Sequence, residues 1–208
     1  MPYRIVRTFE EAIAEWAGSR YAVAVESCTA AILLSCAYMG VEEVEIPART
    51  YPGVACSIIH AGGRIKFHDR PWSGVYELAP YGIWDGALRF RRGMYQGGLH
   101  CLSFHAKKLL PIGRGGMILL NNVDALRWLR LARFDGRREC DLSQQEQYEV
   151  IGYNAYMAPE QAARGLLLFA SIKHRELPDL KVEDQHYPDL SKSGIYQKEE
   201  PQLDLRFA

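Results

Sequence analysis

The chain has 208 residues, of which 48% are apolar and 24% are charged, and its formal net charge at pH 7 is zero. This composition is ordinary for a globular protein and excludes the strongly basic footprint of a nucleic-acid-binding domain. Because no run of about 18 apolar residues is present, the sequence predicts no membrane-spanning helix. We therefore expect neither a nucleic acid nor a membrane among the partners of the chain.

The five cysteines are dispersed without CxxC spacing, and the six histidines show no HxxxH spacing. Such a set is typical of free thiols in a reducing compartment, and a zinc site is not expected. The first seven residues contain no apolar signal region, so the cytoplasm is the expected location.

The first third of the chain alternates short apolar runs with helical segments, most of which end at glycine or proline. Strands are expected at residues 21–25, 44–46 and 64–68, and helices at residues 9–18, 27–39 and 50–61, the first of them capped by Thr8. The order β-α-β-α-β predicts an α/β fold with a mostly parallel sheet and helices on both of its faces.

The pattern changes after residue 69. Residues 70–80 are expected to form a loop, strands are expected at 81–84, 99–104 and 116–120, and helices at 122–135 and 159–174. Because no helix-length segment separates the last two strands, they are expected to pair antiparallel or as a hairpin. The polar segment 178–208 predicts an extended or disordered tail after a domain that covers residues 1–177.

A lysine and a carboxylate lie at or just after the ends of predicted strands. Ser103 and Lys108 flank a short stretch between an apolar run and a glycine turn, and Asp85 ends another apolar run. Open α/β sheets bind ligands at such strand ends. A lysine that can form a Schiff base and a carboxylate that can hold a pyridinium proton are what pyridoxal phosphate (PLP) chemistry needs. The alternatives are that Lys107 and Lys108 are surface lysines and that Asp85 is a turn residue.

Four further residues, at three places in the chain, have two interpretations each. Cys28 and Thr29 begin a helix after a strand, where free N–H groups bind anions or where the turn serves only as a cap. Tyr51 could stack on a planar ring or pack in the core. Asn154 precedes the last helix, where turn or cap use is the alternative to a ligand contact.

Taken in order, six stretches resemble the DegT/DnrJ/EryC1/StrS family of PLP-dependent sugar aminotransferases, which have the fold-type I transferase fold. The resemblance covers roughly residues 6 to 170. The stretches are residues 9–25, Glu26-Ser27-Cys28-Thr29-Ala30-Ala31, Ile46-Pro47-Ala48-Arg49-Thr50-Tyr51, Ile83-Trp84-Asp85-Gly86-Ala87, Ser103-Phe104-His105-Ala106-Lys107-Lys108 and Gly152-Tyr153-Asn154-Ala155-Tyr156-Met157.

The resemblance implies two catalytic residues and an aromatic contact. Lys108 would form the Schiff base, because the spacing of the family's serine and lysine selects it over Lys107. Asp85 would meet the pyridine nitrogen, and Tyr51 would stack on the ring.

The resemblance also implies a set of contacts to the cofactor phosphate. Cys28 and Thr29 stand in the family's phosphate turn, and Ser103 begins the lysine motif. In the family, the residue at the position of Asn154 reaches the phosphate of the neighbouring subunit, which implies a homodimer with shared active sites.

The chain also departs from the family pattern. Cys28 replaces a glycine, Trp84 an acidic residue, and Leu88 the glutamine or histidine that touches the ring hydroxyl. Arg114 stands where glutamate is common, and Tyr156 where arginine is common. Most of the family's small C-terminal domain is expected to be missing, which would affect turnover more than cofactor binding.

Two functions follow as hypotheses. One is a PLP-dependent aminotransferase that acts on a nucleotide-linked keto-sugar through a Lys108 Schiff base. The other is a relative that keeps the fold and the dimer, without turnover, as a binding or assembly protein. A sugar dehydratase is disfavoured, because in that branch of the family a histidine replaces the lysine and Lys108 is present here.

Overall fold

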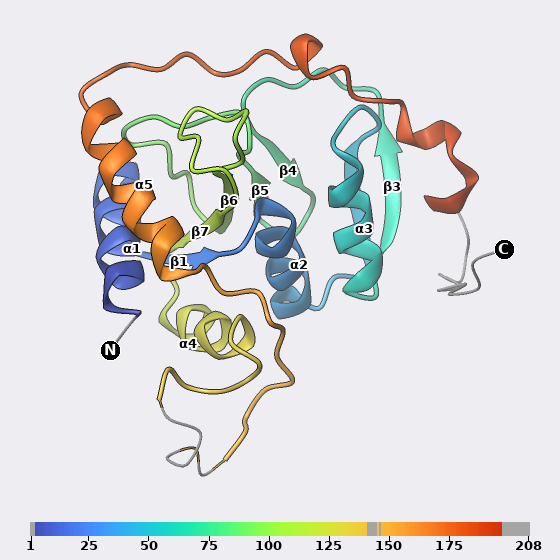
Figure 1. The fold of residues 1–208 in the computed structure, drawn as a ribbon. Helices are drawn as coiled ribbons and strands as arrows, with labels where there is room; N and C mark the ends of the chain where they lie inside the picture. Colours follow the sequence, from blue (N-terminus) through green and yellow to red (C-terminus); the bar gives the residue numbers. More distant parts are fainter. Residues whose placement is uncertain (1–2, 141–144, 146, 197–208) are drawn as a thin grey trace, which may run out of the picture.

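The computed structural model describes residues 3–140, 145 and 147–196, drawn in colour in Figure 1. Its centre is a five-stranded sheet of order β1-β7-β6-β5-β4, beside a two-stranded parallel sheet of β2 and β3. The strands are β1 (Tyr21–Val25), β2 (Glu43–Pro47), β3 (Arg64–His68), β4 (Tyr76–Leu78), β5 (Ile83–Asp85), β6 (Leu99–Ser103) and β7 (Gly116–Leu120).

The α/β fold class is confirmed. The expectation of a mostly parallel sheet is wrong, because most strand pairs of the larger sheet are antiparallel. The pairs β1–β7, β6–β7 and β4–β5 are antiparallel, and in the larger sheet only β5–β6 is parallel. Residues 104–115 contain no helix, so β7 returns beside β6 in the opposite direction, as expected for these two strands. On its other side, β7 pairs with β1. Since β7 opposes both β1 and β6, the strands β1, β5 and β6 still share one direction.

Helices cover both faces of the larger sheet, as expected (Figure 1). Side chains of β1 alternate between two cores, with Val23 and Val25 in one and Ala22 and Ala24 in the other. The first core also contains residues of α2, α3 and α4, and the second contains residues of α1 and α5. The helices are α1 (Arg4–Ala17), α2 (Cys28–Met39), α3 (Pro52–His60), α4 (Val123–Ala132) and α5 (Pro159–Ile172).

Local signals set most helix ends. Ser27 caps α2 by accepting from the Ala30 N–H at 3.0 Å, and Asn122 caps α4 in the same way. Helix α1 begins at Arg4, before the expected start at residue 9, because Thr8 is not its cap. The Thr8 hydroxyl instead donates to the Arg4 carbonyl inside the helix, at 3.2 Å.

The described part of the C-terminal segment, residues 178–196, runs back over the domain (Figure 1). It contains three 3-10 turns, η2 (Glu183–Gln185), η3 (Leu190–Lys192) and η4 (Gly194–Tyr196). Leu190 is 4% exposed and packs into the core of α2 and α3. The remainder of the expected tail, residues 197–208, lies outside the described residues. Within the described ranges, no helix is long and apolar enough to cross a membrane.

Candidate active site

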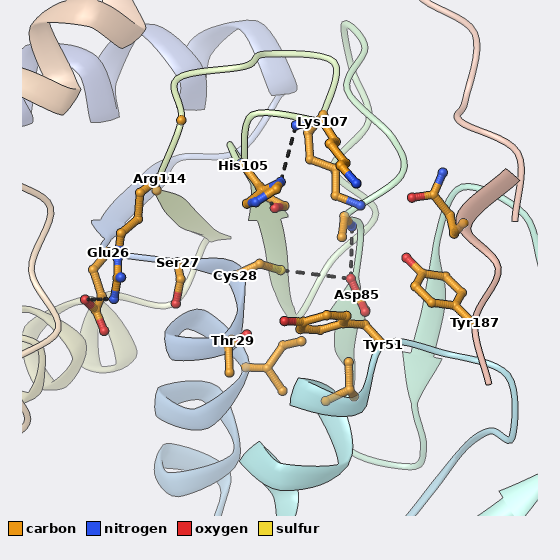
Figure 2. A pocket seen from close by; sticks show the side chains of 18 of the residues that line it. Glu26, Ser27, Cys28, Thr29, Tyr51, Asp85, His105, Lys107, Arg114 and Tyr187 are labelled. Atoms are coloured by element: carbon orange, nitrogen blue, oxygen red, sulfur yellow. Dashed lines mark hydrogen bonds and ion pairs between the residues drawn. The ribbon is translucent and has the colours of Figure 1, made fainter. Parts of the chain in front are cut away.

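The carboxyl ends of β1, β5 and β6 meet the amino end of β7 at one edge of the sheet, and a pocket of about 800 Å³ lies there. This volume is within the range of small-molecule sites. Figure 2 shows how its side chains converge from α2, α3, β5 and the loop before β7. Of the predicted site residues, six line the pocket: Cys28, Thr29, Tyr51, Asp85, Ser103 and Lys108.

Asp85 lies at the end of β5 and is 5% exposed. One carboxylate oxygen accepts from the Ala87 N–H and the other from the Tyr76 hydroxyl, each at 2.9 Å. The Tyr76 hydroxyl also lies 2.6 Å from Thr50 Oγ1. Burial raises the pKa of Asp85, although these donors and the charge of Lys108 oppose the rise. The carboxylate is therefore held in a fixed orientation inside an apolar environment.

Lys108 and Asp85 lie close enough for their charges to interact. Burial lowers the pKa of Lys108, and the neighbouring Asp85 carboxylate opposes that decrease. Lys107 also lines the pocket but is exposed, whereas Lys108 is half-buried. Partial desolvation favours the neutral amine, which is the nucleophilic form of lysine, at Lys108 rather than at its neighbour.

The start of α2 forms an anion cradle at the other end of the pocket. The N–H groups of Cys28 and Thr29 have no acceptor among the described residues, and the positive end of the helix dipole lies here. The backbone of β7 approaches this turn so closely that a Cβ on Gly116 would lie 2.4 Å from the Ser27 carbonyl. Arg114 and Glu26 form an ion pair of 2.6 Å at the rim.

Tyr51 precedes α3, and its ring lies across the pocket near Thr29 and Asp85 (Figure 2). The side chain is 56% exposed, so the core-packing interpretation is wrong. A Cβ on Gly53 would lie 2.7 Å from this ring, which shows how closely the ring covers the helix start. One face of the tyrosine is thus available to a planar ligand.

Asn154 does not line this pocket. Its side-chain amide donates to Asp135 at 3.2 Å, and its backbone pairs with Phe134. The role that the resemblance implies for Asn154 therefore requires a second copy of the chain. Leu88 is fully buried and also lies outside the pocket lining.

Several pocket residues were not predicted from the sequence. Gln185 and Tyr187 lie in the expected tail. Tyr76, which donates to Asp85 but does not itself line the pocket, lies in a segment expected to be a loop. Trp72 lines the pocket from the segment just before β4. No motif or periodicity marks these positions, so only the tertiary structure reveals them. Among the described residues, no group of three metal-binding side chains could hold a metal ion.

Asp85 leads to a prediction for the pH dependence of stability. Its pKa is raised in the folded protein, so ionisation of the buried carboxylate costs stability as the pH rises above the ordinary value of 3.8. Asparagine does not titrate. The stability of the Asp85→Asn variant relative to the unmodified chain should therefore increase between about pH 4 and about pH 7.

Urea unfolding of both chains across this pH range would measure the difference. Asp124→Asn is the matched control, because that side chain is 77% exposed. A stability difference for Asp85→Asn that does not change with pH would contradict the prediction.

The model of the DegT/DnrJ/EryC1/StrS aminotransferase family matches residues 1–71 and 91–177. A curated relative, GDP-perosamine synthase of Caulobacter vibrioides, is 26% identical over 209 aligned residues. The alignment covers 78% of this chain and 56% of that protein. The chain therefore spans little more than half the length of the curated relative it matches.

Solved structures share the fold. The 3-amino-5-hydroxybenzoic acid synthase superposes with a TM-score of 0.71 at 19% identity, covering 82% of this chain and 56% of that one. PseC of Helicobacter pylori, an aminotransferase involved in the biosynthesis of pseudoaminic acid, gives 0.69 at 19% identity, covering 81% and 58%. AtS13 of Actinomadura melliaura gives 0.71 at 21% identity, covering 83% and 61%.

Proposed function

The chain belongs to the DegT/DnrJ/EryC1/StrS aminotransferase family, and from this premise we propose that it is a PLP-dependent aminotransferase. The observation that supports this most directly is the pocket itself, where Lys108, Asp85 and the start of α2 converge. Family membership alone does not require these groups to be retained. Their convergence in one pocket therefore supports the proposed aminotransferase reaction, in addition to the family relationship.

The pocket residues fit PLP. A buried carboxylate suits the pyridine nitrogen, a half-buried lysine suits the aldehyde, and an exposed tyrosine face suits the planar ring. The free N–H groups of α2 and the hydroxyl groups of Thr29 and Ser103 suit the phosphate. Gly116 fits this assignment, because any larger residue would displace the turn that forms the cradle.

When bound, PLP supplies an aldehyde that condenses with amines and a ring that withdraws electrons from the reacting carbon. Lys108 would hold this aldehyde covalently, with release of water, and its amine would then move a proton as general base and acid. Asp85 would keep the ring nitrogen protonated. Tyr76 and Thr50 hold Asp85 in place, since the Tyr76 hydroxyl donates to its carboxylate.

For the substrate, we propose a nucleotide-linked keto-sugar as amino acceptor. This rests on the family and on the name of the GDP-perosamine synthase relative. The wide pocket leaves room for a second molecule beside a cofactor. We also propose that Asn154 completes the phosphate site of a second copy of the chain, because it lies outside its own pocket.

The test is a titration of the purified protein with PLP, followed by L-glutamate. An absorbance band in the visible region, fixed to the protein by borohydride, is expected after the first step. Conversion of bound PLP to pyridoxamine phosphate is expected after the second. If PLP binds covalently and glutamate causes no conversion, the chain is instead a binding or assembly protein. The burial of Leu88 away from the pocket favours this alternative. If no PLP binds, the aminotransferase assignment fails.

A further inference from the structure

Residues 179–190 form a strap that is fastened to the domain at both ends. At one end, Arg89 donates to both carboxylate oxygens of Asp179 at 2.6 to 3.0 Å, and the two side chains are only 15% and 16% exposed. At the other end, the Leu190 N–H donates to the Ala48 carbonyl at 2.9 Å, and the Leu190 side chain is buried. Partly buried bidentate pairs and buried leucines are strong anchors.

The middle of the strap reaches the pocket. Gln185 and Tyr187 line it, and the Tyr187 ring stacks on Trp72 with an interplanar angle of 17° and a centroid distance of 6.3 Å. Trp72 is fixed in turn by a hydrogen bond from its indole N–H to the Arg49 carbonyl, at 3.0 Å. It also contacts Tyr76, with ring centroids 4.6 Å apart.

The strap and the buried carboxylate are therefore linked by a continuous row of rings. Tyr187 packs on Trp72, Trp72 packs on Tyr76, and the Tyr76 hydroxyl donates to Asp85. Each ring is positioned by the next, so the orientation of Tyr187 is tied to that of Asp85.

The surroundings of the Tyr187 hydroxyl are those of the proposed ring site. Burial raises the pKa of Tyr187, and Asp85, Cys28 and Tyr51 raise it further. The hydroxyl therefore stays protonated at neutral pH and remains a hydrogen-bond donor. It has no hydrogen-bond partner in the part of the chain that the structure describes. In Figure 2 it points toward Asp85, and the anion cradle at Ser27 and Thr29 lies on the far side of the pocket.

We propose that Tyr187 is a positioning residue for the cofactor ring, delivered to the pocket by the strap. Its phenol supplies a donor for a polar ring substituent, and its ring supplies an aromatic wall beside Tyr51. Leu88 does not reach the pocket, so Tyr187 provides a polar contact that Leu88 cannot. This inference rests on the proposed function, because it takes the ligand to be PLP.

The experiment measures the equilibrium dissociation constant of PLP from absorbance titrations, without any turnover. Tyr187→Ala is expected to weaken binding about tenfold, and Tyr187→Phe about threefold, since the phenylalanine keeps the wall and loses only the donor. Tyr196→Ala and Tyr196→Phe are the matched controls. Tyr196 lies on the same C-terminal segment, packs on Phe67 and does not line the pocket.

The outcomes separate this inference from the proposed function. If the unmodified chain binds PLP and both Tyr187 variants bind it equally well, the role of Tyr187 is overturned and the proposed function stands. If the Tyr196 variants weaken binding as much as their Tyr187 counterparts, the strap acts only as a structural element and the inference is again overturned. If the unmodified chain does not bind PLP, the proposed function fails first.

Discussion

Replacing Lys108 with alanine is expected to lower aminotransferase turnover by at least about a thousandfold and to abolish covalent attachment of PLP. The half-buried Lys108 is the lysine of the pocket whose charge interacts with Asp85, and burial lowers its pKa. Lys108→Arg should fail in the same way, because a guanidinium stays protonated and cannot act as a nucleophile. The anion cradle of α2 is unchanged in both variants, so weak non-covalent PLP binding should remain.

Borohydride reduction followed by peptide mass mapping would locate the attached cofactor, and the L-glutamate reaction would measure the loss of rate. Lys107→Ala is the control, since Lys107 is the exposed neighbour on the same loop. It is expected to keep the label on Lys108. A label that moves to Lys107, or one that persists in Lys108→Ala, would show that the wrong lysine has been assigned.

Much of the fold follows from local signals. Ser27 and Asn122 cap their helices, and Gly18 and Gly40 take the left-handed conformation just after theirs. These signals act within a few residues, so the sequence alone contains them. The start of α1 was missed because Thr8 could cap a helix or continue one, and nothing local decides between the two.

The direction of the strand pairs could not be derived in the same way. The sequence indicated that β6 and β7 pair antiparallel, and this is confirmed. It contained no sign that β7 also inserts beside β1, because that pairing joins residues 21–25 to residues 116–120. A contact between such distant segments depends on how the whole sheet assembles. Reversing β7 still leaves β1, β5 and β6 in one direction, which brings Asp85 and Ser103 to the same edge as the start of α2.

The residues in and around the pocket also differ in whether the sequence alone identifies them. Residues that belong to short motifs, such as Thr29, Asp85 and Lys108, could be identified because each motif has a fixed spacing. Tyr76 and Tyr187 could not, since their segments have neither motif nor periodicity. They are nonetheless the groups that hold or adjoin Asp85. Short motifs therefore predict several side chains that line the pocket, and the tertiary structure adds those that orient them.

The buried pair of Glu10 and Arg133 leads to the largest expected effect on stability. Both side chains are 2% exposed, and they connect α1 to the end of α4. Glu10 also accepts from the Ala24 N–H at 2.8 Å, while Arg133 donates to the Ala24 carbonyl at 2.6 Å and to Glu139 at 2.9 Å. Arg133 thus satisfies three acceptors from three separate segments.

Arg133→Met is expected to reduce the free energy of unfolding by about 3–5 kcal/mol, because it removes the buried counterion of Glu10 and leaves only the partly exposed Arg130, at 3.5 Å. The double variant with Glu10→Met should lose much less than the sum of the two single changes, since it also removes the buried carboxylate. Urea denaturation of the three variants would measure these differences. Arg127→Met is the matched control: Arg127 forms an exposed pair with Asp124 in the same helix, and its loss should cost less than about 1 kcal/mol. A change for Arg133→Met no larger than that of the control would mean that this buried pair does not hold α1 against the sheet.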